Sequence, residues 1–100
     1  MGQIETTALG YECSGVVTKI GSGIQKFQIG DRVMAIGDGT FATFARFHEL
    51  SAYKMPGTMS FETAASIPVA YGTAYHALKA ARLTKEDTVL IHAATGALGQ

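Results

Sequence analysis

Hydrophobic and polar positions in the first half of the chain follow the short pattern of β-strands. Residues 15–20 form a β-branched run between glycines, residues 32–36 form an apolar run behind a Gly-Asp turn, and residues 52–55 form a short run stopped by Pro56. Turn residues recur about every eight to twelve positions, a spacing typical of antiparallel sheets. The pattern predicts an antiparallel β-rich module over residues 10–56.

An Asp-Gly pair at residues 38 and 39 separates two apolar runs. This dipeptide is the strongest short-range hairpin signal, because tight hairpin turns need residues that accept a positive φ. Residues 41–47 are therefore expected to return as a strand. The preceding Gly30-Asp31-Arg32 segment is interpreted as a structural turn with a local interaction between Asp31 and Arg32.

The pattern changes to a helical period after Pro56. Ser60 suits an N-cap and Glu62 suits a first turn, so a short helix is expected to end before Pro68. Pro68 can itself begin a longer helix over residues 68–83. Apolar residues there recur at three- and four-residue spacing and are interpreted as core, namely Tyr71, Ala74, Tyr75, Leu78 and Ala81.

The last stretch of the chain carries the clearest candidate chemistry. An apolar run at residues 89–91 predicts a strand, and it leads into a small-residue turn with Ala94, Gly96 and Gly99. Small residues allow the sharp bend, the close approach of a pyrophosphate and tight packing of a following helix, which should begin near Ala97. The alternative is an ordinary glycine-rich turn of an α/β unit. The residues of the turn that are predicted to contact a dinucleotide cofactor are Ala94, Gly96, Ala97, Leu98 and Gly99.

Composition and charge narrow the function classes. The 100 residues carry eight basic and eight acidic side chains without blocks, so nothing is suited to a run of phosphates in a nucleic acid. The longest apolar stretches are far below the ~20 residues of a membrane span. Cys13 is the only cysteine, so no disulfide framework is expected, which fits a reducing cytoplasmic compartment.

The histidines show no metal-ligand spacing. His48, His76 and His92 lie far apart in the chain, and Cys13 stands alone, so no metal site is expected. His48 is interpreted as a surface strand residue and His76 as a helix residue. For His92, a packed and hydrogen-bonded side chain is weighed against one that approaches a cofactor.

Several motifs occur in an ordered combination along the chain. They are Gly2-Gln3-Ile4-Glu5-Thr6-Thr7, Gly10-Tyr11-Glu12-Cys13-Ser14-Gly15-Val16-Val17, Gly30-Asp31-Arg32-Val33, Ile67-Pro68-Val69-Ala70-Tyr71-Gly72-Thr73-Ala74 and Val89-Leu90-Ile91-His92-Ala93-Ala94 ahead of the glycine turn. The combination resembles the medium-chain dehydrogenase/reductase superfamily. Within it, the chain looks most like the enoyl reductase domain of fungal highly reducing polyketide synthases.

The resemblance implies an α/β fold class, with a β-rich GroES-like portion followed by the start of a Rossmann domain, truncated at both ends. It implies a partial GroES-like β module over residues 1–56, connecting helices over residues 57–87, and the first Rossmann strand and its glycine-rich turn over residues 88–100. The cofactor of such proteins lies in the cleft between the two domains.

Site residues can be carried over only in part. Zinc-dependent relatives have a His where this chain has Tyr11, so the resemblance implies a zinc-independent protein. Tyr11 is interpreted as a packed ring, with a proton donor as the alternative. By the same resemblance Thr73 lies beside the nicotinamide, although helix packing could also explain the small residues around it. The catalytic residues are unknown, because the proton donors proposed for the family lie outside the chain.

The implied function is NADPH-dependent reduction of an α,β-unsaturated acyl thioester on an acyl carrier protein, and NADH is not excluded. Hydride would pass to the β-carbon of the substrate. One alternative is a quinone oxidoreductase-like reductase, and another is a non-catalytic GroES-like module. The 100-residue chain alone is expected to be inactive and to bind NADPH weakly. A longer protein that contains this chain is expected to be an oxidoreductase, with a dimer as one state it could adopt.

Overall fold

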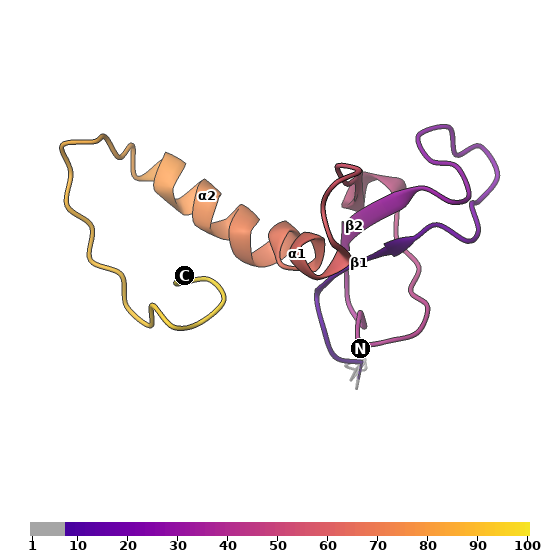
Figure 1. The fold of residues 1–100 in the computed structure, drawn as a ribbon, viewed down its shortest axis with the longest axis horizontal. Coiled ribbons are helices and arrows are strands. Elements are labelled where there is room, and N and C mark those ends of the chain that lie inside the picture. The colour runs from indigo at the N-terminus through magenta and orange to yellow at the C-terminus, as the bar shows by residue number, and fades with distance from the viewer. Residues whose placement is uncertain (1–7) are drawn as a thin grey trace, which may run out of the picture.

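The computed structural model describes residues 8–100 and contains a small antiparallel sheet followed by helices (Figure 1). The strands are β1 (Glu12–Val16), β2 (Arg32–Ile36) and β3 (Ala52–Lys54), paired in that order. A short 3-10 turn, η1 (Glu49–Ser51), precedes β3. Residues 1–7, which carry part of the family resemblance and the start of the expected β module, lie outside the described residues.

The two faces of the sheet have different roles. In the register of β1 and β2, Cys13 lies opposite Ala35 and Gly15 opposite Val33. These positions share a face with the small core, in which Phe27 and Ala52 pack on Ala35. The other face, reached by alternate residues of each strand, lies against the helices. The strand alternation therefore separates an apolar core from a helix-bearing surface.

The helices follow the predicted start signals. Ser60 accepts a hydrogen bond from the backbone N–H of Thr63 and caps α1 (Phe61–Ala65), as expected. A π-helical turn, η2 (Ile67–Tyr71), and then α2 (Gly72–Ala80) replace the single helix predicted over residues 68–83. The wider turn is marked by the backbone N–H of Tyr71, which donates to the carbonyl oxygen of Ser66 five residues earlier.

The predicted return strand over residues 41–47 is wrong. The chain after Gly39 folds back on the residues before β1 instead. Gly39 donates its N–H to the carbonyl oxygen of Gly10 at 3.0 Å, and Phe41 donates to that of Leu9 at 2.9 Å. The N–H of Phe41 is therefore not available to a returning strand. Residues 41–47 form no strand, and the Phe41 side chain is 82% exposed. The strand expected at residues 15–20 is displaced, since β1 begins at Glu12.

The expected Asp31–Arg32 interaction is also wrong. Asp31 accepts a hydrogen bond from the N–H of Gln28 at 2.9 Å and forms an ion pair with Lys54 at 3.4 Å. Arg32 extends the other way, toward the segment before α1. Neighbouring strand residues point to opposite faces of a sheet, so two adjacent side chains seldom meet.

The C-terminal part of the chain is an extended arm. Figure 1 shows it leaving α2, arching away and curling back toward the helix. Residues 89–91 are not a strand, contrary to prediction, since no described strand lies beside them. The radius of gyration is 16.3 Å, against ~13 Å for a compact chain of this length. No helix in the described part is long and apolar enough to cross a membrane.

Candidate functional site

Three polar side chains on the helix-bearing face of the sheet hold the helices in place. Glu12 accepts hydrogen bonds from the N–H groups of η2, and the Ser14 hydroxyl donates to the carbonyl oxygen of Phe61 at 2.5 Å. Arg32 donates to the carbonyl oxygens before α1, and its guanidinium lies 4.5 Å from the ring centre of Phe61. Ser14 and Arg32 thereby hold α1 and the segment before it, and Glu12 holds η2, from which α2 continues.

Thr73 lies in the first turn of α2 and is exposed. Because α2 continues directly from η2, the position of Thr73 depends on how η2 is held against β1. The side chain of Thr73 is therefore accessible to a ligand. Its predicted place beside a nicotinamide stays a prediction.

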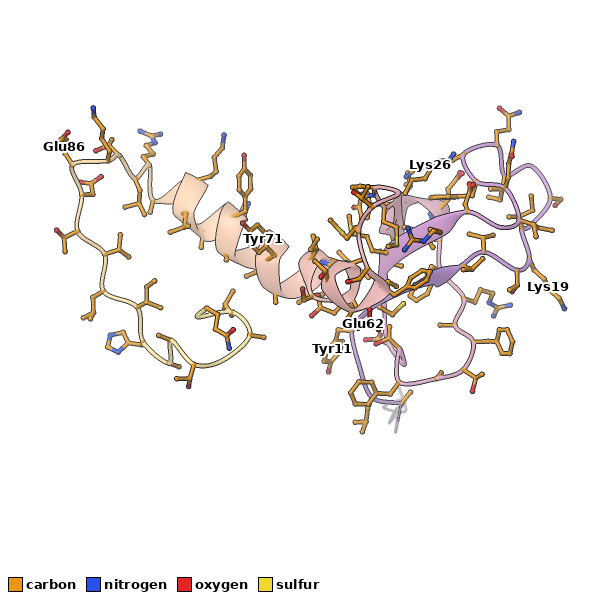
Figure 2. The ribbon with its side chains drawn as sticks, in the orientation of Figure 1. Tyr11, Lys19, Lys26, Glu62, Tyr71 and Glu86 are labelled. Carbon is orange, nitrogen blue, oxygen red and sulfur yellow. The ribbon has the colours of Figure 1, made fainter. Side chains whose placement is uncertain are left out.

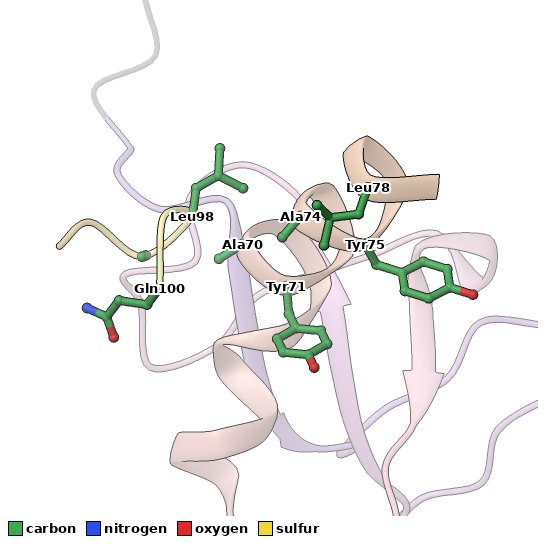
Figure 3. A pocket seen from close by; sticks show the side chains of 8 residues that line it. Ala70, Tyr71, Ala74, Tyr75, Leu78, Leu98 and Gln100 are labelled. Carbon is green, nitrogen blue, oxygen red and sulfur yellow. The ribbon is translucent and has the colours of Figure 1, made fainter. Parts of the chain in front are cut away.

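A hollow of about 220 Å³ lies between the helices and the curled C-terminal turn (Figure 3). In Figure 3 the turn, with Leu98 and Gln100, lies beside the helix at Ala70 and Ala74. The hollow includes two of the predicted cofactor contacts, Ala97 and Leu98, but not Thr73, Ala94, Gly96 or Gly99. Its lining is formed by Ala70, Tyr71, Ala74, Tyr75, Leu78, Ala97, Leu98 and Gln100.

The interpretation of the α2 face as core is wrong for this chain. The side chain of Tyr71 is 69% exposed, that of Tyr75 61% and that of Leu78 47%. Ala81, at the end of this face, is exposed as well. The periodic face exists, but the described residues do not cover it.

The glycine turn is compact. Gly96 donates its N–H to the carbonyl oxygen of Ala93 at 3.1 Å, and Gly99 donates to that of Gly96 at 3.1 Å. A Cβ atom on Gly99 would collide with the carbonyl oxygen of Ala93 and lie 2.7 Å from the Cα of Ala94. The turn can close this tightly only with glycine at Gly99.

The same turn suits an anionic group. Within residues 8–100, the backbone N–H groups of Ala97 and Leu98 have no acceptor. Unpaired and exposed N–H groups at a small-residue turn are the donors that phosphate oxygens use. A helix was expected to begin near Ala97, but residues 97–99 form only a turn in this structure. The unpaired N–H groups belong to that turn. The residues of the turn therefore fit a dinucleotide pyrophosphate.

Two aromatic side chains differ from their sequence interpretations. Tyr11 is 67% exposed rather than a packed ring, and Figure 2 shows it pointing away from the ribbon. His92 is exposed in the C-terminal arm rather than packed. Both interpretations assumed a surrounding core, and the described residues supply none at these positions.

The other two histidines, His48 and His76, lie at helical segments. His76 lies on α2, as predicted. His48 is exposed as expected, yet it is not in a strand: its Nδ1 accepts a hydrogen bond from Leu50 N–H and caps η1.

Partial burial raises the pKa of the Cys13 thiol. No group of three or more His, Cys, Asp or Glu in the described part of the chain could hold a metal ion.

Sequence reasoning missed the role of Glu12. Its partners are backbone groups 57 and 58 positions away, so no side-chain pattern reveals the contact. The only available signal was an acidic residue inside an otherwise apolar and small-residue strand motif. An unpaired carboxylate there would be costly, which implies a partner without naming it.

Comparison with known proteins decides the family. Residues 2–57 match the family model of the alcohol dehydrogenase GroES-like domain. The chain belongs to this family. Residues 2–57 of this chain are the β-rich GroES-like part of the medium-chain dehydrogenase/reductase fold, as the sequence predicted for residues 1–56.

Two of its curated relatives are fungal polyketide synthases, as the sequence resemblance indicated. The highly reducing polyketide synthase tstA of Talaromyces stipitatus is 54% identical over 101 residues, and phiA of a fungal species is 52% identical over 101 residues. Each match covers 100% of this GroES-like chain and 4% of the relative. The chain thus spans a small part of the length of these relatives.

Solved structures share the fold. JamJ enoyl reductase is 38% identical with a TM-score of 0.82, covering 90% of this chain and 28% of its own. The human synaptic vesicle membrane protein VAT-1 homolog-like protein is 39% identical with a TM-score of 0.84, covering 90% and 29%. The quinone oxidoreductase of Coxiella burnetii is 36% identical with a TM-score of 0.76, covering 91% and 30%.

Proposed function

We propose that this chain is part of the enoyl reductase of a reducing polyketide synthase. The substrate is an α,β-unsaturated acyl thioester carried on an acyl carrier protein, and the reductant is NADPH. The observation that carries the proposal is the 54% identity to a highly reducing polyketide synthase across the whole chain. The likeness to JamJ enoyl reductase supports the reductase part of such a synthase as the matching region.

In this proposal the chain spans two structural units and their connection. Residues 1–56 belong to the GroES-like β module, residues 57–87 connect the units, and residues 88–100 begin a Rossmann domain. The free N–H groups of Ala97 and Leu98, with the small residues Ala94, Gly96 and Gly99, bind the pyrophosphate. Thr73 contacts the nicotinamide end. NADPH, when bound, supplies the hydride for reduction of the double bond.

Further features of the proposal concern the larger protein. It acts in the cytoplasm, which agrees with a single, unpaired cysteine. The residues that select the ribose 2′-substituent are expected ~20 positions past the glycine turn, which is outside these 100 residues. The preference for NADPH over NADH therefore rests on the resemblance. The isolated chain is expected to show no reductase activity.

A quinone oxidoreductase is the second candidate. The likeness to the Coxiella burnetii quinone oxidoreductase favours it, since the same fold then acts on a free small molecule. The two candidates differ in substrate: a carrier-bound thioester for one, and a soluble quinone for the other. A non-catalytic module, in which the turn binds no dinucleotide, is the remaining alternative.

The test uses the full-length protein that contains this chain. NADPH oxidation is followed by absorbance with crotonyl thioester on a carrier protein, with crotonyl-pantetheine, and with a benzoquinone. We expect turnover of both thioesters, faster on the carrier, and little with the quinone. Turnover of the quinone alone would favour the second candidate. No NADPH oxidation with any enoyl thioester would reject the proposed function.

A further inference from the structure

We propose that Glu12 is a positioning residue, which sets the helix carrying Thr73 at its working distance from the cofactor. This inference rests on the proposed function. Its starting observation is geometric: the Glu12 Oε2 atom lies 2.7 Å from the backbone nitrogen of Val69 and 3.3 Å from that of Ala70. One carboxylate oxygen of β1 thus binds two successive N–H groups inside η2.

The bonds have a clear local cause. The first N–H groups of a helix lack acceptors within the helix, and a negative charge near them is favourable. Pro68 has no N–H to donate, so Val69 and Ala70 are the next donors along η2. Glu12 is half-buried and reaches them from the sheet. The side chain therefore supplies the acceptor that the π-helical turn does not.

The bonds also determine where α2 starts. Ala70 is 9% exposed and lines the hollow that faces Leu98, so it is held between the sheet and the C-terminal turn. Thr73 follows Val69 by four residues and lies on the same side of the helix. Moving η2 along the sheet would move Thr73 with it. Glu12 thus acts on a cofactor through the helix rather than by contact.

Ser14 provides a matched comparison. It lies two residues after Glu12 on the same face of β1 and also bonds to helix backbone. Its partner is the carbonyl oxygen of Phe61 in α1, not η2. A general loosening of the helices would make the Ser14 and Glu12 variants alike. A specific role in placing Thr73 would separate them.

The test measures NADPH and acyl thioester kinetics of the full-length protein with variants of Glu12. Glu12→Ala should raise KM for NADPH about tenfold, the order expected for loss of hydrogen bonds to a charged group. KM for the acyl thioester should change less than about twofold. Ser14→Ala should leave both KM values unchanged. An equal rise in KM for NADPH in Ser14→Ala, or none in Glu12→Ala, would overturn the proposal.

Two conservative variants separate reach from charge. Glu12→Gln keeps an acceptor oxygen at the same reach, so KM for NADPH should rise only about threefold, because a neutral acceptor is weaker. Glu12→Asp keeps the charge but is one methylene shorter, and it should resemble Glu12→Ala. The reverse order, with Gln as poor as Ala and Asp near the wild type, would identify a charge-dependent role and reject positioning by reach.

A second measurement does not depend on the reaction. Hydrogen exchange of the peptide containing Val69 and Ala70 should lose protection in Glu12→Ala and keep it in Ser14→Ala. If the wild-type protein oxidises no NADPH but this difference is seen, the proposed function fails while the tie between Glu12 and η2 stands. If NADPH oxidation is normal and exchange is unchanged in Glu12→Ala, the positioning role fails alone.

Discussion

At the scale of single residues, a Cβ atom on Gly99 would approach backbone atoms more closely than a Cβ atom on any other described glycine. A Cβ atom there would collide with the Ala93 carbonyl oxygen, and relieving such a clash costs ~1–3 kcal/mol. In the full-length protein we expect Gly99→Ala to open the turn and weaken NADPH binding by about tenfold or more, measured by calorimetric titration. Gly57→Ala is the control, because no atom lies within 4 Å of the place that a Cβ atom on Gly57 would occupy. Unchanged affinity in Gly99→Ala would show that the compact turn is not used for binding.

The carboxyl group of Asp31 makes the free energy of unfolding depend on pH in the acidic range. The hydrogen bond from Gln28 N–H lowers the pKa of Asp31; partial burial opposes this effect, and the ammonium of Lys54 adds to it. A lowered pKa in the folded state stabilises the fold above the unfolded pKa of ~3.9, and the contribution is lost as pH falls through the folded value. Asp31→Asn should therefore reduce the free energy of unfolding at neutral pH and flatten its fall below about pH 4.

Urea denaturation at neutral and acidic pH checks this expectation. Asp38→Asn is the control, because Asp38 is exposed and has no hydrogen bond or ion pair within the described residues. We expect Asp38→Asn to leave the pH dependence unchanged. Equal pH profiles for the wild type and Asp31→Asn would contradict a role for this carboxyl in acid stability.

At the scale of elements, Arg32 joins β2 to the segment that leads into α1. Its guanidinium donates to the carbonyl oxygens of Gly57 at 2.8 Å and Met59 at 2.7 Å, and it lies 4.5 Å from the ring centre of Phe61. A Lys side chain has no planar guanidinium, so it cannot donate to both carbonyl oxygens and contact the aromatic ring in the same way. Arg32→Lys should thus lower the free energy of unfolding by ~1–3 kcal/mol, measured by chemical denaturation. Lys19→Arg, at an exposed position, is a control that should have no effect.

Elements set by neighbouring residues could be predicted from the sequence. β2 has the predicted bounds, β3 lies within the expected run, and Ser60 caps α1, because strand alternation and capping are local effects. The absence of the return strand over residues 41–47 could not be predicted, since the chain that leads into it is bonded at Gly39 and Phe41 to Gly10 and Leu9. That competition depends on contacts distant in sequence, which periodicity does not report.

The candidate site divides in the same way. The turn at residues 94–99 was found from its small residues, because close approach of backbone requires them. The carboxylate of Glu12 was missed, because its partners are backbone groups in η2. The α2 face was recognised as apolar but wrongly assigned to a core, since periodicity shows which side is apolar and not what covers it. The roles of Thr73 and the turn residues stay predictions.

At the scale of the whole molecule, large apolar side chains are exposed along the described chain, and those of α2 and the arm after it lie apart from the core. Figure 2 shows side chains projecting from both sides of the arm that follows α2. Exposed large apolar side chains in this half of the chain are Tyr71, Tyr75, Leu78, Leu83, Val89, Leu90, Ile91 and Leu98. Large apolar side chains that are exposed together on one helix face mark an interface or a site of association. The small core of Phe27, Ala35 and Ala52 lies in the other half.

This distribution predicts how the isolated chain behaves. Since the α2 face and the arm are uncovered, the 100-residue chain should self-associate at micromolar concentration and bind a hydrophobic dye. Replacing Tyr75 and Leu78 together by Ser should reduce the mass seen by sedimentation, because it removes apolar area from that face. Leu50→Ser is the matched control: Leu50 is 74% exposed but lies on η1, away from α2, so the replacement should leave association unchanged. A monodisperse wild-type chain that binds no dye would show that the arm folds back over the helix in solution.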